Sequence, residues 1–502
     1  MQLINAETDG HLWAEIYDRE LSAENIFAIQ SEVTSAVTSA LKAKLTDGEK
    51  AQLHEIPTKS LEAWMAYQMG KQRLANRNTQ NFNEAEIFFR KAIDLDPVFV
   101  NAYAALIDTL RLKISFNNAN PKPLIVESER YLKTAMNLDP NNAAVWSSAA
   151  GIDQIKGNYV NAEKNFRKAI LLDPNYVPAY EWLSSQLSLL GKKNEALQFA
   201  RKAVELDPLS ALGHASLAEI LDNSEMYDEA LESYQRAHNL DPTISGVLVG
   251  QALILSYVKN RFVEALKLIA QAKALDPGLS SIQAIQLSLY FDLMEDELLR
   301  KALQDEIMKN PLGARDDTAI GLLSLIDGNI PEAMIYAQNT YKADPTNFWL
   351  LSTIYLYQGK PELSKSLYQK TMPEFFTEKA PEVNLDNYLA ALDVAMIMLK
   401  LGDAQKANII LDGVSKGFAV IPDFGFYGDG ILEVEVIALR GEKSKALLAL
   451  RQLQRSGWHG PNWRYYRDID PAFSSIRSEQ EFKAIFADIE KDMLRQRELI
   501  KK

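Results

Sequence analysis

The stretch Ala143 to Pro174 reads AAVWSSAAGIDQIKGNYVNAEKNFRKAILLDP, and its ending recurs along most of the chain. The tripeptide Leu-Asp-Pro, or a close variant, returns with its proline at spacings of 43, 34, 34, 34, 35, 34 and 34 residues. A period of this length is typical of proteins in which each helical repeat packs on the next. The recurring prolines are Pro97, Pro140, Pro174, Pro208, Pro242, Pro277, Pro311 and Pro345.

Each period also contains a pattern of small and aromatic residues before its proline. Most periods have alanine twelve and five positions before the proline, and some have an aromatic residue eight positions before it. These offsets place the side chains on one face of a helix, where alanine lets a neighbouring helix approach closely. The residues are Ala85, Ala162, Ala196, Ala230, Ala265 and Ala333, then Ala92, Ala135, Ala169, Ala203, Ala237 and Ala272, and Phe89, Phe166 and Tyr234.

The repeat also predicts where helices end. Each proline disfavours the α conformation of the residue before it, and a glycine between the two helical runs favours a left-handed C-terminal cap. Each period therefore predicts two helices joined by a tight turn, and the insertion Ser115–Pro123 predicts a longer turn. The cap glycines are Gly157, Gly191, Gly328, Gly359, Gly402 and Gly441.

This pattern resembles the tetratricopeptide repeat, whose aromatic, small, aromatic, small and proline positions match Trp146, Ala162, Phe166, Ala169 and Pro174. The resemblance implies an all-α fold, a right-handed superhelix of about eleven helix pairs between Ser60 and Ser456. The matching positions in the next two repeats are Ala196, Ala203, Pro208, Ala230, Ala237 and Pro242.

The two ends of the chain differ from the repeats. The N-terminus reads MQLINAETDGHLWAEIYDREL, where Asp9-Gly10 between strand-like runs predicts a β-hairpin, and an amphipathic helix is predicted from Asn25 to Leu45. This start resembles the end of the TolB-like α/β domain that precedes tetratricopeptide arrays in many bacterial regulators, and the residues from Gly457 resemble the end of those proteins. We therefore expect an α/β remnant over 1–57, repeats over 58–456 and a helical capping segment over 457–502. Alternatively, the hairpin is an independent cap on the array.

The composition of the chain argues against several classes of function. The net charge of −13, from 54 basic and 67 acidic residues, argues against binding to nucleic acid phosphates. No apolar run is long enough to span a membrane, and no secretory signal precedes the hairpin. The chain has no cysteine, which excludes disulfides and thiolate chemistry.

The sequence also lacks catalytic and metal-binding patterns. The five histidines are not spaced as metal ligands, and His214 and His238 occupy packing positions of the repeat. The glycine-rich Gly425–Gly430 carries no lysine, and we interpret it as an inter-helix loop. We expect no catalysis, no cofactor and no metal ion.

Resemblance to the repeat family places the first helix of each pair along a concave groove that binds an extended peptide or a partner helix. Four carboxylates make the front of this groove acidic, which predicts a basic or amphipathic protein segment as the partner. Alternatively, these side chains are solvated polar residues of a scaffold. The front positions are Asn101, Asp108, Arg111, Ser147, Gly151, Gln154, Glu181, Ser185, Ser188, Glu219 and Asp222, and the later, apolar positions are Val249, Leu253, Ala284, Phe291, Leu322 and Leu325.

We therefore expect a non-catalytic protein-interaction scaffold or sensory module of a bacterial signalling or transcriptional regulator. In the regulators that it resembles, the front end is a winged-helix DNA-binding domain (CadC-like activators), a class III nucleotide cyclase or a Ser/Thr kinase, and no such motif lies within this chain. A third alternative is an assembly scaffold that forms homodimers through the exposed hairpin edge. The expected location is the cytoplasm, or the periplasm if the chain is part of a membrane-anchored regulator.

Overall fold

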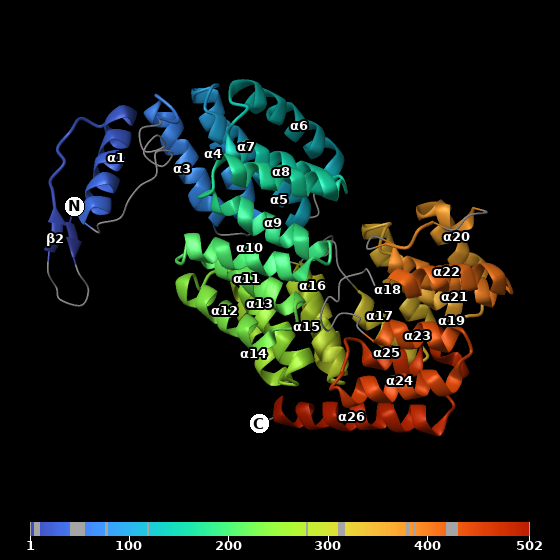
Figure 1. The fold of residues 1–502 in the computed structure, drawn as a ribbon. Coiled ribbons are helices and arrows are strands. Elements are labelled where there is room, and N and C mark those ends of the chain that lie inside the picture. The colour runs from blue at the N-terminus through green and yellow to red at the C-terminus, as the bar shows by residue number, and fades with distance from the viewer. Residues whose placement is uncertain are drawn as a thin grey trace. The chain divides into compact units, whose positions relative to one another are not determined.

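Helices dominate the structure, as the repeat pattern predicts (Figure 1). The computed structural model describes residues 2–4, 11–40, 56–75, 79–117, 120–277, 280–309, 317–377, 381–384, 387–417 and 430–500. Within these residues lie 25 α-helices and one two-stranded sheet. The predicted all-α fold class is therefore confirmed.

Consecutive helices pair along the chain. The described residues contain eleven sets of two helices that follow each other in sequence, and contacts join the two helices in the ten sets other than α9 with α10. In order, the pairs are α3 (Leu61–Ala75) with α4 (Thr79–Leu95), α5 (Val100–Asn117) with α6 (Pro121–Leu138), α7 (Ala143–Ile155) with α8 (Tyr159–Leu172), α9 (Val177–Leu189) with α10 (Lys193–Leu206), α11 (Ala211–Asn223) with α12 (Tyr227–Leu240), α13 (Ser245–Leu253, continued by the π-helix Ile254–Val258) with α14 (Phe262–Leu275), α15 (Ser280–Asp292) with α16 (Asp296–Lys309), α17 (Thr318–Ile326) with α18 (Ile330–Ala343), α19 (Trp349–Tyr357) with α20 (Pro361–Thr371), α21 (Tyr388–Lys400) with α22 (Ala404–Gly417), and α23 (Ile431–Leu439) with α24 (Lys443–Arg455).

The predicted helix ends are confirmed. The second helix of a pair ends two residues before its proline, as α8 ends at Leu172 before Pro174. All six cap glycines have φ between 69° and 84°, the left-handed region that glycine adopts without strain. Three repeats without this glycine place Glu225, Asn260 and Met294 at the same point with φ of 52–61°. The repeat thus requires a left-handed residue between its two helices, because non-glycine residues adopt this conformation there although their side chains disfavour it.

The insertion in the second repeat does not form the longer turn that the sequence predicts. Instead, α5 and α6 each contain 18 residues, whereas α7 and α8 contain 13 and 14. The extra residues continue both helices because Pro121 occupies the first turn of α6, where a missing N–H costs nothing, and Asn120 caps that turn.

The small residues of the pattern form the packing interface. The alanines twelve and five positions before the prolines are at most 1% exposed, and Phe89 and Phe166 are completely buried. A Cβ added at Gly70 would lie 2.6 Å from the ring of Phe89, which shows how closely α3 and α4 approach. The predicted helix face is therefore the face that packs.

The described residues divide into two compact units, which we call unit 1 (Met1–Trp182) and unit 2 (Leu183–Lys502). The repeat pattern does not indicate this boundary, because it falls inside α9. In unit 1 the predicted hairpin is present as β1 (Gln2–Ile4) and β2 (His11–Ala14), which pair antiparallel. The predicted turn lies outside the described residues. Helix α1 (Ala23–Ala40) follows, and its Phe27 contacts Trp64 of α3 with ring centroids 4.7 Å apart.

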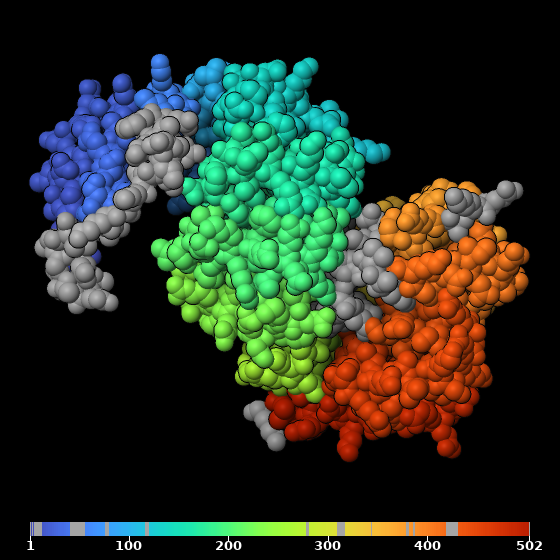
Figure 2. Space-filling view, in the orientation of Figure 1, coloured from blue at the N-terminus to red at the C-terminus, as the bar shows by residue number. Residues whose placement is uncertain are grey.

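Unit 2 ends in a segment, residues 457–500, that we call the C-terminal segment. It contains α25 (Trp463–Asp468), a 3-10 helix (Pro471–Ser475) and α26 (Gln480–Ile500). Helix α26 packs on both α24 and α14, and Figure 2 shows the red residues of α26 against the yellow-green residues of the middle repeats. Side chains of this segment belong to the hydrophobic cores of α13–α15, α15–α19 and α19–α23. The segment is therefore part of the core of unit 2.

Candidate functional sites

The first-helix face of unit 1 carries a polar network between successive repeats. The side chain of Asn142, at the start of α7, donates a hydrogen bond of 3.0 Å to Oδ1 of Asn101 on α5. Ser148 of α7 donates to Oδ1 of Asp108 at 3.0 Å and contacts the carbonyl of Ala104 at 3.2 Å. Two predicted groove residues, Asn101 and Asp108, therefore also connect one repeat to the next.

A buried arginine connects three repeats on the same face. Arg111 of α5 is 5% exposed, and its guanidinium carbon lies 3.7 Å from the ring centroid of Trp182 on α9, a cation–π contact. Gly151 of α7 makes room for it, since a Cβ there would lie 2.6 Å from the Arg111 side chain. Ser147 is also buried, whereas Gln154 and Glu181 are partly exposed.

Two phenols of unit 1 have pKa values raised by burial and by nearby carboxylates. Burial raises the pKa of Tyr67 to about 12, and the charge of Asp108 contributes. Burial likewise raises the pKa of Tyr176 well above its usual value, with smaller contributions from Asp108 and Glu181 among others. The charge of Asp108 thus helps to raise the pKa of both phenols, and the charge of Glu181 helps to raise the pKa of Tyr176. We call Tyr67, Asp108, Tyr176 and Glu181 the acidic aromatic face.

The remaining predicted groove positions lie in unit 2. Ser185 is partly exposed and Glu219 is exposed, whereas Ser188 is buried and accepts a hydrogen bond of 3.3 Å from Asn223. Burial and the charge of Glu219 raise the pKa of Asp222 to about 7. Asp222 is therefore only partly ionised near pH 7, so the negative charge here is smaller than the sequence predicts.

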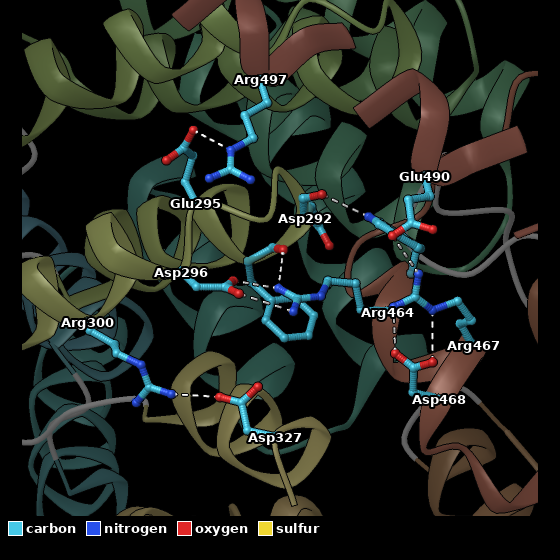
Figure 3. A network of polar contacts seen from close by, with 12 residues as sticks. Asp292, Glu295, Asp296, Arg300, Asp327, Arg464, Arg467, Asp468, Glu490 and Arg497 are labelled. Carbon is cyan, nitrogen blue, oxygen red and sulfur yellow. Dashed lines mark hydrogen bonds and ion pairs between the residues drawn. The ribbon is translucent and has the colours of Figure 1, made fainter. Parts of the chain in front are cut away.

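Three of the six later, apolar positions are completely buried, and one of them, Phe291, contacts the C-terminal segment. Phe291 of α15 is completely buried, and the guanidinium of Arg464 lies 4.8 Å from its ring centroid. The same guanidinium contacts the Phe291 carbonyl at 3.2 Å and forms an ion pair with Asp296 at 2.7 Å (Figure 3). Leu322 and Leu325 of α17 are also completely buried. These three apolar side chains do not line an open groove, whereas Val249, Leu253 and Ala284 are partly exposed.

One buried carboxyl anchors the segment. Asp292, at the end of α15, accepts hydrogen bonds from the Tyr257 hydroxyl at 2.9 Å and from the Asn462 backbone at 2.8 Å. Its own carbonyl accepts a 2.9 Å bond from the indole of Trp463, which is completely buried. Burial raises the pKa of Asp292 to about 8, although the hydrogen bonds and Arg464 oppose the shift.

Further polar contacts lie within the segment and between the segment and the repeats. Arg497 of α26 contacts Glu295 at 2.8 Å, and Arg467 contacts Asp468 at 2.8 Å (Figure 3). Asp492 of α26 contacts His459 at 2.9 Å and accepts a 3.0 Å hydrogen bond from Asn260. The sequence does not suggest these pairings, because the partners lie up to 232 positions apart.

A cavity of about 460 Å³ lies between the repeats of unit 2 and the C-terminal segment. Its wall is aromatic on one side, where Trp349 of α19 and Tyr465 of α25 meet with ring centroids 5.0 Å apart. Three acidic residues also line it: Asp393 of α21, Glu435 of α23 and Asp470. The sequence analysis did not identify these acids, which occupy equivalent first-helix faces of two degenerate repeats and the loop before the 3-10 helix.

The environment of these acids favours their neutral forms. Burial raises the pKa of Asp393 to about 7, against the opposing effect of the Tyr368 hydroxyl, which donates to it. Burial and the neighbouring Asp470 raise the pKa of Glu435, and burial also raises that of Asp470. Oδ1 of Asp470 accepts the backbone N–H of Ala472 at 2.8 Å. We call Asp393, Glu435 and Asp470 the acid triplet.

Two of the histidines, His214 and His459, make hydrogen-bond contacts within the fold. His214 contacts the carbonyl of Pro208 at 3.1 Å, which matches the bonds that Tyr103, Trp146 and Tyr180 donate to the prolines six positions before them. Among the described residues, no group of three or more histidine, aspartate or glutamate side chains could hold a metal ion. The glycine-rich stretch lies outside the described residues except for Gly430. None of the described helices is long and apolar enough to cross a membrane.

Comparison with known families identifies the repeats. Two family models described as tetratricopeptide repeat match residues 74–99 and 177–208, and 214–244. The chain contains tetratricopeptide repeats. The matched stretches cover helix pairs or parts of pairs with the turns and alanine packing described above, and repeats of this kind form protein-interaction scaffolds.

One protein of known sequence is similar to part of the chain. The chain is 37% identical over 105 residues, 21% of its length, to a protein of Rhizobium meliloti (strain 1021) named "Putative adenylate cyclase 3". The matched part spans only 18% of that relative.

Solved structures of other repeat proteins are similar to parts of the chain. Pseudomonas aeruginosa pilF is 21% identical, covers 45% of this chain and 96% of its own, and has a TM-score of 0.31. A thermophilic repeat protein of Thermus thermophilus is 20% identical, covers 39% and 99%, and has a TM-score of 0.32. YrrB, titled a repeat protein with an unusual peptide-binding site, is 24% identical, covers 38% and 93%, and has a TM-score of 0.26.

Proposed function

We propose that unit 1 binds a basic or amphipathic segment of a partner protein on its acidic aromatic face. The proposal is supported by the charges of Asp108 and Glu181, which act on the partly buried phenols of unit 1: Asp108 helps to raise the pKa of Tyr67 and Tyr176, and Glu181 that of Tyr176. Aromatic side chains supply contact area, and neighbouring carboxylates favour cationic partners and increase their rate of association.

The chemistry of the face favours lysine or arginine in the partner. A cationic side chain can contact both the carboxylates and the electron-rich ring faces, whereas an acidic segment would be repelled. The buried stack of Arg111 on Trp182 holds the first helices of three repeats together, which pre-organises the face and reduces the entropy cost of binding.

The test uses peptides of equal length with basic amphipathic, acidic amphipathic and neutral sequences, measured by fluorescence anisotropy against the full chain. The basic peptides should bind most tightly, and added salt should weaken their binding. Glu181→Lys should weaken it about tenfold, equivalent to about 1.4 kcal/mol. The control is Asp94→Lys, which reverses the charge of an exposed carboxylate on α4, a second helix. Equal affinity for basic and acidic peptides, or an effect of the control as large as that of Glu181→Lys, would refute the proposal.

A second proposal concerns the whole protein. We infer that this chain is the sensory or regulatory part of a bacterial signalling protein, supported by its match to the Rhizobium meliloti relative. The N-terminal hairpin and α1 support the same idea as the end of an α/β domain that begins upstream. Sequencing the reading frame upstream of Met1 tests it: an encoded α/β and effector domain would support this context, and a stop codon in frame directly before Met1 would contradict it.

A further inference from the structure

The cavity of unit 2 combines features of a ligand site that the repeats alone do not require. Its volume of about 460 Å³ lies in the range of small-molecule pockets, which are typically apolar with a few convergent polar groups. The acid triplet supplies those groups, and Trp349 and Tyr465 supply aromatic surface. Most buried acids in proteins are paired, so three acids at one cavity call for a specific explanation.

The cation whose charge acts on the triplet, Arg477, bonds to backbone carbonyls rather than to the acid side chains. The Arg477 guanidinium lowers the pKa of Asp470 through its charge, but its hydrogen bonds go to the backbone carbonyls of Arg467 and Asp470. Asp470 is 1% exposed, and no hydrogen-bond donor contacts its Oδ2. The acidic proton of Glu435 is the neighbouring group able to satisfy that oxygen while the cavity holds no cation.

We propose that this cavity binds a small organic cation, an amine or guanidine whose N–H groups bond to the acid triplet while its carbon skeleton contacts Trp349 and Tyr465. A cation would allow the acids to ionise, because it would compensate negative charge that is otherwise costly in a low-dielectric site. Its N–H donors would bond carboxylates with the strength of charge-assisted hydrogen bonds. The aromatic wall would add a cation–π contact.

The same groups disfavour other ligands. An anion would be repelled by the triplet. A metal ion needs several ligand oxygens around one point, and the described residues contain no group of three acids or histidines arranged in that way. A neutral ligand would leave the acids protonated and would gain no charge-assisted bond. An organic cation with several donors is therefore the class that fits.

The inference is independent of the partner proposed for unit 1, and it links ligand binding to the C-terminal segment. Asp470 and Tyr465 come from that segment, whereas Asp393 and Glu435 come from the repeats. A ligand that bonds to both sides would hold the segment on the repeats, since it would bind only when both sides are in place.

The test measures binding to the full chain by isothermal titration calorimetry. The probes are phenethylamine, its neutral isostere 2-phenylethanol, phenylacetate, 4-aminobutylguanidine and magnesium chloride. We expect one molecule of at least one of the two organic cations to bind per chain, with release of protons as the acids ionise, detected by repeating the titration in buffers of different ionisation enthalpy. The neutral and anionic probes and Mg²⁺ should not bind.

Variants assign the binding to the triplet. Glu435→Gln and Asp393→Asn keep the shape of each side chain and remove its charge, and each should weaken cation binding by about 10- to 100-fold. The matched control is Glu433→Gln, an exposed residue two positions from Glu435 on the same helix, which should bind as the unaltered chain does. Should Glu435→Gln fail to fold, Asp393→Asn alone decides.

Three outcomes would overturn the inference. One is that 2-phenylethanol or phenylacetate binds as tightly as phenethylamine. Another is that neither organic cation binds at millimolar concentration. The third is that Asp393→Asn and Glu435→Gln bind cations as well as Glu433→Gln does.

Discussion

Units 1 and 2 are built from the same helix pairs, but they treat the first-helix face differently. In unit 1 this face is polar: Asn101, Asp108 and Ser148 take part in hydrogen bonds between repeats, and the acidic aromatic face lies beside them. In unit 2 the face becomes apolar at Phe291 and Leu322, and the chain covers it with its own C-terminal segment. The packing pattern of the repeat therefore determines the scaffold, while the composition of the inner face determines what can lie on it.

The C-terminal segment covers the apolar face of unit 2 for a physical reason. An apolar face of this size would otherwise expose its hydrophobic area to water, at about 25 cal/mol for each Å². The C-terminal segment buries that area with Trp463, Tyr465 and Phe473, which are at most 6% exposed. The polar face of unit 1 has no comparable cost, because its carboxylates and amides can hydrogen-bond to water. We expect experiments on the two units to differ accordingly.

The largest difference is expected for Trp463→Ala. The indole is completely buried and donates a hydrogen bond to the Asp292 carbonyl, so its removal should lower the free energy of unfolding of unit 2 by about 3–5 kcal/mol. Hydrogen exchange with mass spectrometry should show lost protection over residues 457–500. The control Trp146→Ala removes a half-exposed indole of unit 1, so its effect should be smaller and confined to unit 1. Unchanged protection of 457–500 in Trp463→Ala would show that the segment does not depend on this anchor.

The next difference concerns pH. The folded state raises the pKa of Asp393 from 3.8 to about 7, so between these values folded unit 2 holds a proton that the unfolded chain has lost. The free energy of unfolding of unit 2 should therefore fall as pH rises from about 4 to about 7, by on the order of 2–4 kcal/mol. Urea unfolding at pH 5 and at pH 8 measures this. Asp393→Asn should reduce the dependence, and the raised pKa values of Asp222 and Asp292 should maintain the remainder.

Unit 1 should respond to acid in the opposite direction. Burial alone would raise the pKa of Glu86, but hydrogen bonds and ion pairs from Lys113 and Arg90, both at 2.7 Å, outweigh burial and lower it. The stabilisation is present above pH 4.5 and is lost as pH falls below it through the lowered pKa of Glu86. Glu86→Gln should remove this acid sensitivity. If unit 1 instead gained stability on acidification below pH 4.5, the assignment to Glu86 would be wrong.

The units should respond alike where the repeat packing is the same. Ala169→Leu in unit 1 and Ala203→Leu in unit 2 each place a larger side chain into a completely or almost completely buried helix contact, and each should cost about 1–3 kcal/mol. The control Val160→Leu changes a side chain of α8 that is 80% exposed and should stay within about 0.5 kcal/mol. Urea unfolding measures all three. An effect in only one unit would show that the alanine contact is not equivalent in both.

The sequence predicts those interactions whose partners lie close together along the chain. The alanines, the prolines and the cap glycines act within one repeat, so spacing alone identifies their roles. The cover on Phe291 depends on Arg464, which is 173 positions away, and no local pattern reports such a pairing. The acid triplet was missed for the same reason, since Asp393, Glu435 and Asp470 meet only after folding. One usable signal was present: an apolar inner face followed by an aromatic-rich C-terminus predicts that one covers the other.

The smallest expected difference concerns the bond from the residue six positions after each proline. The Tyr180 hydroxyl of unit 1 donates to the Pro174 carbonyl at 2.9 Å, and His214 of unit 2 contacts the Pro208 carbonyl at 3.1 Å. Leu248, six positions after Pro242, has no group that could donate. Tyr180→Phe should cost about 0.5–1.5 kcal/mol, because the carbonyl can recover part of the bond from water. Leu248→Met keeps the volume of a side chain that makes no such bond and should cost less than about 1.5 kcal/mol through packing alone. Thermal unfolding of Tyr180→Phe beside Tyr103→Phe tests whether the bond has the same value in two repeats of the same type. If neither substitution changed the unfolding temperature, the hydroxyls would be solvated equally well without the proline carbonyls, and this contact would not contribute to the stability of the repeat.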